Sequence, residues 1–170
     1  MTVTIDTGLS KTERNDVATE LTKVLADSFA VYLKTHGYHW NVRGPEFFGY
    51  HNLLEQQYRD IWAALDDIAE RIRALGVLAP QSFSGFGNLT SIKDGDPEKE
   101  AGPMLKELLG DHDTLIATTR KAFEVADAAG DEASADLLTQ RLAAHGKFAR
   151  KSGGLRGHEP CSGPVIGRFG

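Results

Sequence analysis

An unbroken apolar seam over residues 47–75 constrains the fold more than any other feature of the sequence. Its members alternate steps of four and three residues, and they are Phe47, His51, Leu54, Tyr58, Ile61, Leu65, Ile68, Ile72 and Leu75. Side chains at this spacing share one face of an α-helix, and such a face is stable only when other helices cover it. The segment from about Pro45 to Gly76 is therefore predicted to be a long helix in a bundle.

Three further long helices are predicted on the same grounds. The first spans about residues 10–42 and ends before Gly44-Pro45, because the residue before a proline disfavours the helical conformation. The other two span about residues 97–129 and 131–151. The buried face of the 97–129 helix is predicted to consist of Met104, Leu105, Leu108, His112, Leu115, Thr119, Ala122 and Ala126. The connection "VLAPQSFSGFGNLTSIKDGDP" is too long for a hairpin turn, and we expect a short helix around "FGNLTSI".

This order of elements predicts an all-α fold. Four long helices with one long crossover, between the second and the third, fit a ferritin-like four-helix bundle as well as a simpler bundle. A chain of 170 residues is most simply one domain. We expect an N-terminal arm at residues 1–9, the bundle at 10–151, and a flexible basic tail containing Gly and Pro at 152–170.

Composition narrows the location and the kind of metal site. No apolar run approaches the ~20 residues needed to span a bilayer, so no membrane association is expected. The first residues lack a basic stretch followed by an apolar one, so we expect no signal peptide and a cytoplasmic location. The single Cys161 excludes an intrachain disulfide and a cysteine-based zinc cluster. A metal site would therefore use His, Asp and Glu, which suit iron, manganese or zinc.

Charge is distributed unevenly along the chain. The net charge of −5 argues against a main domain that binds nucleic acid, because affinity for phosphate comes from clustered basic residues. Residues 146–170, in contrast, carry five basic residues against the single Glu159. Any contact with DNA would most plausibly use these five, which are Lys147, Arg150, Lys151, Arg156 and Arg168.

A second stripe on the predicted 45–76 helix carries side chains that bind metals. Successive residues of an α-helix are rotated by about 100° around its axis. On this basis the side chains that lie next to the apolar seam include Glu55, Trp62, Asp66 and Glu70. Asp66 and Glu70 are four residues apart, so their carboxylates project from adjacent turns and could clasp one cation. The mixture of ligand-type residues with a large aromatic is unusual for a merely solvated face.

Helix length decides how such a site could be built. His51 and Asp66 are fifteen residues apart, which is ~22 Å along a straight helix, so they cannot bind one metal within one chain. If two copies of the helix crossed antiparallel about a twofold axis near residues 58 and 59, His51 would meet the partner's Asp66 and Glu70. His39, near the end of the first helix, could complete the histidine side from its own chain.

The residues by themselves leave a second interpretation open, in which no metal is bound. A histidine in a helix is usually a packing or surface residue, and acidic pairs on helices are usually solvated. His36 is predicted to point elsewhere on its helix, and His112 and His145 to be hydrogen-bonded core residues. No E-x-x-H motif occurs, so a di-iron centre inside one bundle is not available.

The region "KTHGYHWNVRGPEFFGYHNLLEQQYRDIWAALDDIAERIRALG" resembles the signature region of the Dps family, the DNA-binding proteins from starved cells. The resemblance covers roughly residues 10–145, including "QSFSGFGNLTSI" and "AGDEASADLLTQRL". It implies a hollow dodecamer of four-helix subunits that oxidises Fe(II), preferably with hydrogen peroxide, and stores the ferric product in its cavity. Such a protein protects DNA from oxidative stress.

The resemblance also implies residue roles. By position in the motif, His39 and His51 match the family's histidine ligands, and Asp66 and Glu70 match the carboxylates from the twofold partner. These four residues are the expected catalytic set of a ferroxidase. Glu55 matches an acidic position of a second, weaker metal site. Iron is the expected metal, with zinc or manganese as alternatives at the same site.

The resemblance also concerns the ion pores of the family, and this chain departs from the family at the end of the last helix. Asp131 and Asp136 match acidic residues that line the family's threefold ion pores. Family members commonly continue the last helix as H-E-K-x-x-W-M-L, whereas Gly146 weakens this helix and Arg150 replaces an expected aromatic. Two alternatives to the ferroxidase remain: a nucleoid-binding protein that contacts DNA through its basic tail, and a helical assembly without metal chemistry.

Overall fold

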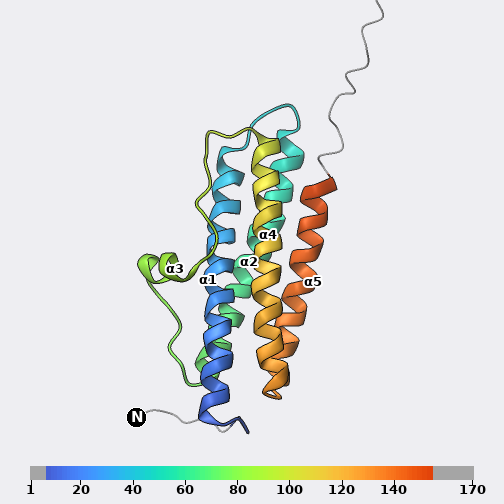
Figure 1. The fold of residues 1–170 in the computed structure, drawn as a ribbon. Helices are drawn as coiled ribbons and strands as arrows, with labels where there is room; N and C mark the ends of the chain where they lie inside the picture. Colours follow the sequence, from blue (N-terminus) through green and yellow to red (C-terminus); the bar gives the residue numbers. More distant parts are fainter. Residues whose placement is uncertain (1–6, 155–170) are drawn as a thin grey trace, which may run out of the picture.

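The computed structural model describes residues 7–154, which form five helices and no strand. The helices are α1 (Lys11–Asn41), α2 (Phe47–Ala74), α3 (Phe83–Leu89), α4 (Ala101–Ala128) and α5 (Glu132–Gly154). The four long helices run side by side as one bundle, and α3 lies outside it, next to α1 (Figure 1). The predicted all-α bundle with a short crossover helix is confirmed. In this part of the chain no helix is long and apolar enough to cross a membrane.

The start of α1 and the turn into α2 follow from local sequence. Ser10 caps α1, because its hydroxyl accepts from the Glu13 amide while the Glu13 carboxylate accepts from the Ser10 amide. After α1 ends, Gly44 adopts a φ of +122°, a conformation that L-residues with a side chain rarely take. This turn reverses the chain and sets the N-terminal end of α2 beside the C-terminal end of α1.

The long helices bury the faces that periodicity predicts. All eight side chains of the predicted face of α4, from Met104 to Ala126, are buried. On α2 the seam is buried from Leu54 to Leu75 except at Tyr58, whereas Phe47 is 44% exposed. The first turn of α2 therefore contributes little to the core. His51, the next seam residue, contacts His39 at the end of α1.

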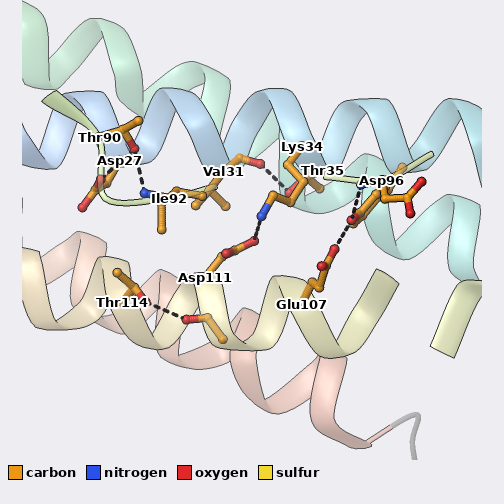
Figure 2. Close-up of polar contacts among 12 residues, drawn as sticks. Asp27, Val31, Lys34, Thr35, Thr90, Ile92, Asp96, Glu107, Asp111 and Thr114 are labelled. Atoms are coloured by element: carbon orange, nitrogen blue, oxygen red, sulfur yellow. Dashed lines mark hydrogen bonds and ion pairs between the residues drawn. The ribbon is translucent and has the colours of Figure 1, made fainter. Parts of the chain in front are cut away.

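The crossover is tied to the bundle by Asp27, a buried carboxylate that forms no ion pair within residues 7–154. Asp27 is 1% exposed and accepts hydrogen bonds from the hydroxyls of Thr90, Ser91 and Thr118, and from the Ser91 amide at 2.7 Å. Figure 2 shows Thr90 beside Asp27 where the crossover passes along α1. Several donors on one oxygen pair satisfy a buried carboxylate without a counter-ion. The crossover is thus fixed to α1 and α4 at once.

One ion pair and one hydrogen bond join α1 to α4 farther along the bundle. The Lys34 ammonium lies 2.7 Å from the Asp111 carboxylate, and both side chains are largely buried. The Tyr38 hydroxyl donates to Glu107, which also accepts from Lys99. Figure 2 shows the contact of Lys34 with Asp111 and the position of Glu107 on α4. These contacts cross the interface between α1 and α4 near the end of α1 that carries His39.

The last helix begins as predicted and ends later. The Asp131 carboxylate caps α5 by accepting from the Ser134 amide at 3.1 Å. The predicted end at Lys151 is three residues early, because Ser152 is fully buried and accepts from the Gln57 amide, which holds the last turn against α2. Residues 152–154 therefore belong to the bundle. The rest of the predicted tail, with Arg156 and Arg168, lies outside the described residues.

Candidate metal site

His39, in the last turn of α1, and His51, in the second turn of α2, lie against each other. Their rings stack with centroids 3.7 Å apart and planes 23° apart. The two residues are twelve positions apart in sequence, and the Gly44 turn brings them together. The convergence of these two histidines, predicted from the sequence, is present in the structure.

Hydrogen bonds fix the orientation of both rings. The Nδ1 atom of His39 lies 3.0 Å from the His51 carbonyl oxygen, and the Nδ1 atom of His51 lies 3.0 Å from the His39 carbonyl oxygen. Carbonyl oxygens only accept, so each Nδ1 carries the hydrogen and each Nε2 of a neutral ring keeps its lone pair. A ring fixed in this way through Nδ1 is the usual state of a metal-binding histidine. Both Nε2 atoms therefore fit a divalent metal.

Glu55 lies one turn after His51 and is ionised. Its carboxylate accepts from Arg59, with the nearest contact at 2.7 Å. The hydrogen bond from Arg59 lowers the pKa of Glu55, and the nearby rings of His39 and His51 add to this effect. Arg59 thus holds the Glu55 carboxylate, and Glu55 does not form a three-residue metal group with the two histidines of its own chain.

Asp66 and Glu70 lie farther along α2, and their side chains are exposed. The fifteen residues from His51 to Asp66 lie within one helix and span ~22 Å, so the structure does not bring these carboxylates to the histidines of the same chain. Within residues 7–154, no group of three or more His, Cys, Asp and Glu side chains is close enough to hold a metal. One chain therefore presents a histidine half and a carboxylate half separately.

His36 lies next to the histidine pair, and its predicted orientation away from the site is wrong. Its ring stacks on Tyr58 with centroids 3.8 Å apart, and its Nδ1 atom lies 3.2 Å from the Tyr32 hydroxyl. The His36 and His39 rings are 6.0 Å apart. A signal was available in the sequence, since residues three apart on a helix differ by only about 60° in direction.

An open pocket of about 310 Å³ lies beside His36. It is lined by Tyr32, His36, Tyr58, Arg59 and Trp62. Trp62 is 58% exposed, and Trp40, which contacts His36, is 63% exposed. Burial lowers the pKa of His36, so this ring stays neutral to lower pH than a free histidine. The surface around the candidate site is therefore rich in aromatic rings and also carries the ion pair of Glu55 and Arg59.

The residues predicted to line pores or to contact DNA lie elsewhere. Asp131 is 3% exposed and is bound by Arg71 at 2.6 Å, so its charge is already compensated within the chain. Asp136 is exposed and accepts from Gln140. On α5, Lys147 and Arg150 are exposed, whereas Lys151 is half buried and reaches the Gln56 side chain.

Comparison with known proteins gives consistent matches over most of the chain. Residues 18–155 match the ferritin-like domain model. The chain is 37% identical to a low temperature-induced protein of Nostoc sp. over 85% of this chain and 82% of that protein. It is 34% identical to the DNA protection during starvation protein of Brevibacillus brevis, over 72% of this chain and 82% of that protein.

A solved structure agrees with the fold at similar coverage. The Dps protein from Vibrio cholerae O1, described as a member of a broad superfamily of ferritin-like diiron-carboxylate proteins, superposes with a TM-score of 0.85. The match has 29% sequence identity and covers 92% of this chain and 98% of that one. The chain therefore belongs to the Dps family of ferritin-like proteins.

Proposed function

We propose that this protein oxidises Fe(II) at sites shared by two copies of the chain and stores the ferric product inside a hollow homododecamer. Iron is both the substrate and the cargo. The observation that carries the proposal is the pair of His39 and His51, whose Nδ1 hydrogen bonds leave two Nε2 lone pairs on one chain, while no third His, Cys, Asp or Glu within residues 7–154 completes a metal group with them. Membership of a family whose relatives are named for DNA protection supports the same reading.

Each residue has a role set by its chemistry. His39 and His51 bind Fe(II) through Nε2, and the partner's Asp66 and Glu70 supply oxygen ligands and negative charge. Glu55 binds a second iron once that cation replaces Arg59 at the carboxylate. Mn(II) and Zn(II) can use the same donor set and would compete with iron.

The proposed reaction balances with hydrogen peroxide as the oxidant. Two Fe(II) ions give up one electron each, the O–O bond of the peroxide breaks, and each oxygen leaves as hydroxide. The Fe(III) then hydrolyses, releases protons and deposits as a ferric oxyhydroxide. Because Fe(II) and peroxide are removed together, one-electron formation of hydroxyl radicals is suppressed. DNA is thereby protected without direct contact, in the cytoplasm.

Mixing two inactive variants tests whether the site is shared. His51→Ala and Asp66→Ala should each lose peroxide-dependent Fe(II) oxidation. Assemblies refolded from an equal mixture should regain about a quarter of the wild-type sites, because statistically half of the twofold pairs are mixed and each mixed pair has one intact site of two. A mixture as inactive as its parents contradicts the shared site. If either single variant, or the double variant, oxidises Fe(II) at the wild-type rate, the ferroxidase proposal is wrong.

A second function, DNA binding through the basic C-terminal region, is favoured by the exposure of Lys147 and Arg150 on α5. Truncation after Gly154 leaves the bundle whole and removes Arg156 and Arg168. If the tail binds DNA, the truncated protein should lose retention on DNA at moderate salt while keeping its Fe(II) oxidation. Equal retention of the two proteins would exclude this function for the tail.

A further inference from the structure

A network of buried polar side chains crosses the bundle core and includes a residue of α2 close to Glu55. It joins α5, α2 and α4 through Ser152, Gln57, His112 and His145, each of which is at most 1% exposed. The Gln57 amide nitrogen lies 3.2 Å from the Ser152 hydroxyl, and the Gln57 carbonyl oxygen lies 3.3 Å from Nε2 of His112. The Nδ1 atoms of His112 and His145 are 3.3 Å apart.

With the Gln57 nitrogen donating to Ser152, these contacts define which ring nitrogens carry hydrogen where the two histidines meet. The Gln57 nitrogen donates to Ser152, so the Gln57 oxygen faces His112 and can only accept. Nε2 of His112 must therefore carry a hydrogen. A neutral imidazole has one N–H, so Nδ1 of His112 accepts, and Nδ1 of His145 donates to it. All three hydrogen bonds can form only while His112 is neutral, because its Nδ1 must accept.

An added proton has no favourable place in this network. On His112 the proton would bind at Nδ1, which lies 3.3 Å from Nδ1 of His145. Two N–H donors would then face each other in the core without an acceptor between them. On His145 the proton would leave a positive charge buried near Arg141, a charge of the same sign. Either outcome is costly, because an ionised group in the core is stabilised only by a partner of opposite charge or by several hydrogen bonds.

The charged surroundings do not offset this cost. Arg141 on α5 disfavours the charged form of both rings, and its own charge is paired with Asp60 of α2 at 2.7 Å. Among the described residues, the charged groups that act on the rings are Arg141, which acts on both, and His112, which acts on His145. Burial lowers the pKa of His112 to about 4, and burial with Arg141 lowers the pKa of His145 well below its usual value.

We propose that His112 and His145 form an acid-sensitive latch that holds the end of α5 against α2 and α4 while both rings are neutral, and that proton uptake releases it. Ser152 lies in the last turn of α5, and Gln57 lies on α2 between Glu55 and Tyr58. Release therefore frees both the C-terminal turns of α5 and the turn of α2 beside the candidate metal site. The latch does not depend on the proposed iron chemistry.

The direction of the pH effect follows from linkage. Both rings have a lower pKa in the closed bundle than in the released state, so the released state binds more protons as the pH falls below the ordinary value of 6.5. Stability from the latch is complete above that value and is lost on acidification. Between about pH 7 and about pH 5, the equilibrium constant for opening should rise about 20-fold because of His112, and His145 changes it in the same direction.

Amide hydrogen exchange of the full-length, metal-free protein tests the proposal. In the wild type, peptides from residues 145–154 should open at least about 20-fold more at about pH 5 than at about pH 7, after correction for intrinsic exchange. The double variant His112→Gln/His145→Gln should lose this dependence, because glutamine does not titrate. His36→Gln, which removes a histidine outside the core, should keep it. A double variant with the wild-type dependence overturns the proposal.

Histidine exchange in the wild type decides the question if the double variant does not fold. Deuterium exchange at the imidazole C2 position, followed by mass spectrometry, reports the pKa of each histidine. We expect His112 and His145 to remain neutral at about pH 5 wherever the end of α5 is still protected. If either ring titrates near 6.5 while α5 stays protected, the latch is wrong, and the iron proposal is unaffected because no metal is present.

Discussion

The Nδ1 atoms of His39 and His51 each lie 3.0 Å from the backbone oxygen of the other residue. The carbonyl of His39 is available because it lies in the last turn of α1, where helical carbonyls lack a partner within the helix. The end of one helix thus orients the ring carried by the next, before any metal arrives.

This arrangement predicts how His51 contributes to metal binding. His51→Gln removes an Nε2 ligand and one of the two reciprocal bonds, so Co(II) or Zn(II) binding measured by calorimetry should weaken by about 100-fold. His36→Gln is the matched control, because His36 packs beside the pair without facing the shared bonds, and it should weaken binding by less than about 10-fold. Equal losses in the two variants would contradict the assignment of His51.

Asp131 should make stability sensitive to acid. Burial raises the pKa of Asp131, but hydrogen bonds from Arg71 and Ser134 lower it more, and the net shift is downward. A carboxylate with a lowered pKa stabilises the fold above its ordinary value of 3.8 and loses that contribution as the pH falls below it. Asp131→Asn should therefore show a smaller loss of thermal stability than the wild type on acidification below about pH 4.

Asp131→Ala tests the same contact at neutral pH. It removes the cap of α5 and leaves the Arg71 guanidinium without its carboxylate, and we expect a loss of about 2–4 kcal/mol in the free energy of unfolding. Denaturant titrations at one protein concentration give this value, since oligomer stability depends on concentration. A change below about 0.5 kcal/mol would mean that the buried pair contributes nothing net.

The crossover should loosen when Asp27 is changed. Asp27→Ala leaves the donors of Thr90, Ser91 and Thr118 without their acceptor, at a cost of about 2–3 kcal/mol. Limited proteolysis should then cleave within residues 78–95 faster than in the wild type. Asp94→Ala, a change of an exposed acid in the same crossover, serves as the control and should leave the cleavage rate unchanged.

Two glycines of the same helical hairpin should respond in opposite directions. Gly130 follows α4 with a φ of +69°, so Gly130→Ala should destabilise the protein by about 1 kcal/mol. Gly110 lies within α4, and a methyl group there would meet nothing within 4 Å. Gly110→Ala should therefore raise stability by about 0.5–1 kcal/mol. Thermal denaturation of both variants provides the comparison, and a stabilising Gly130→Ala would contradict it.

Periodicity predicted the bundle well because one rule governs each long helix. The face of α4 from Met104 to Ala126 was predicted completely, since from Leu105 onward its buried positions follow steps of three and four. The end of α5 was not, because Gly153 and Gly154 favour termination locally while the contact of Gln57 with Ser152 is a tertiary one. No local signal in the sequence contains that contact.

Some features of the candidate metal site could likewise be predicted from the sequence, and others could not. The meeting of His39 and His51 was predictable from the turn at Gly44-Pro45, which must return the chain along α1. The stacking of His36 on Tyr58 was missed, because it depends on the rotation of α1 relative to α2. Hydrogen-bond direction at each ring was equally beyond reach, since it depends on where backbone carbonyls point. The roles of Asp66 and Glu70 as partners of the histidines stay predictions.

The rigid length of α2 makes the proposed chemistry a property of the pair and not of the chain. His51, in the second turn of α2, and Asp66, in the C-terminal half of the same helix, lie ~22 Å apart along the folded helix. A newly made, solitary chain would then hold both kinds of ligand and still be inert toward iron. Activity per chain would fall on dilution as pairs separate, so the cell's supply of assembled protein, and not of polypeptide, would set how fast iron is removed.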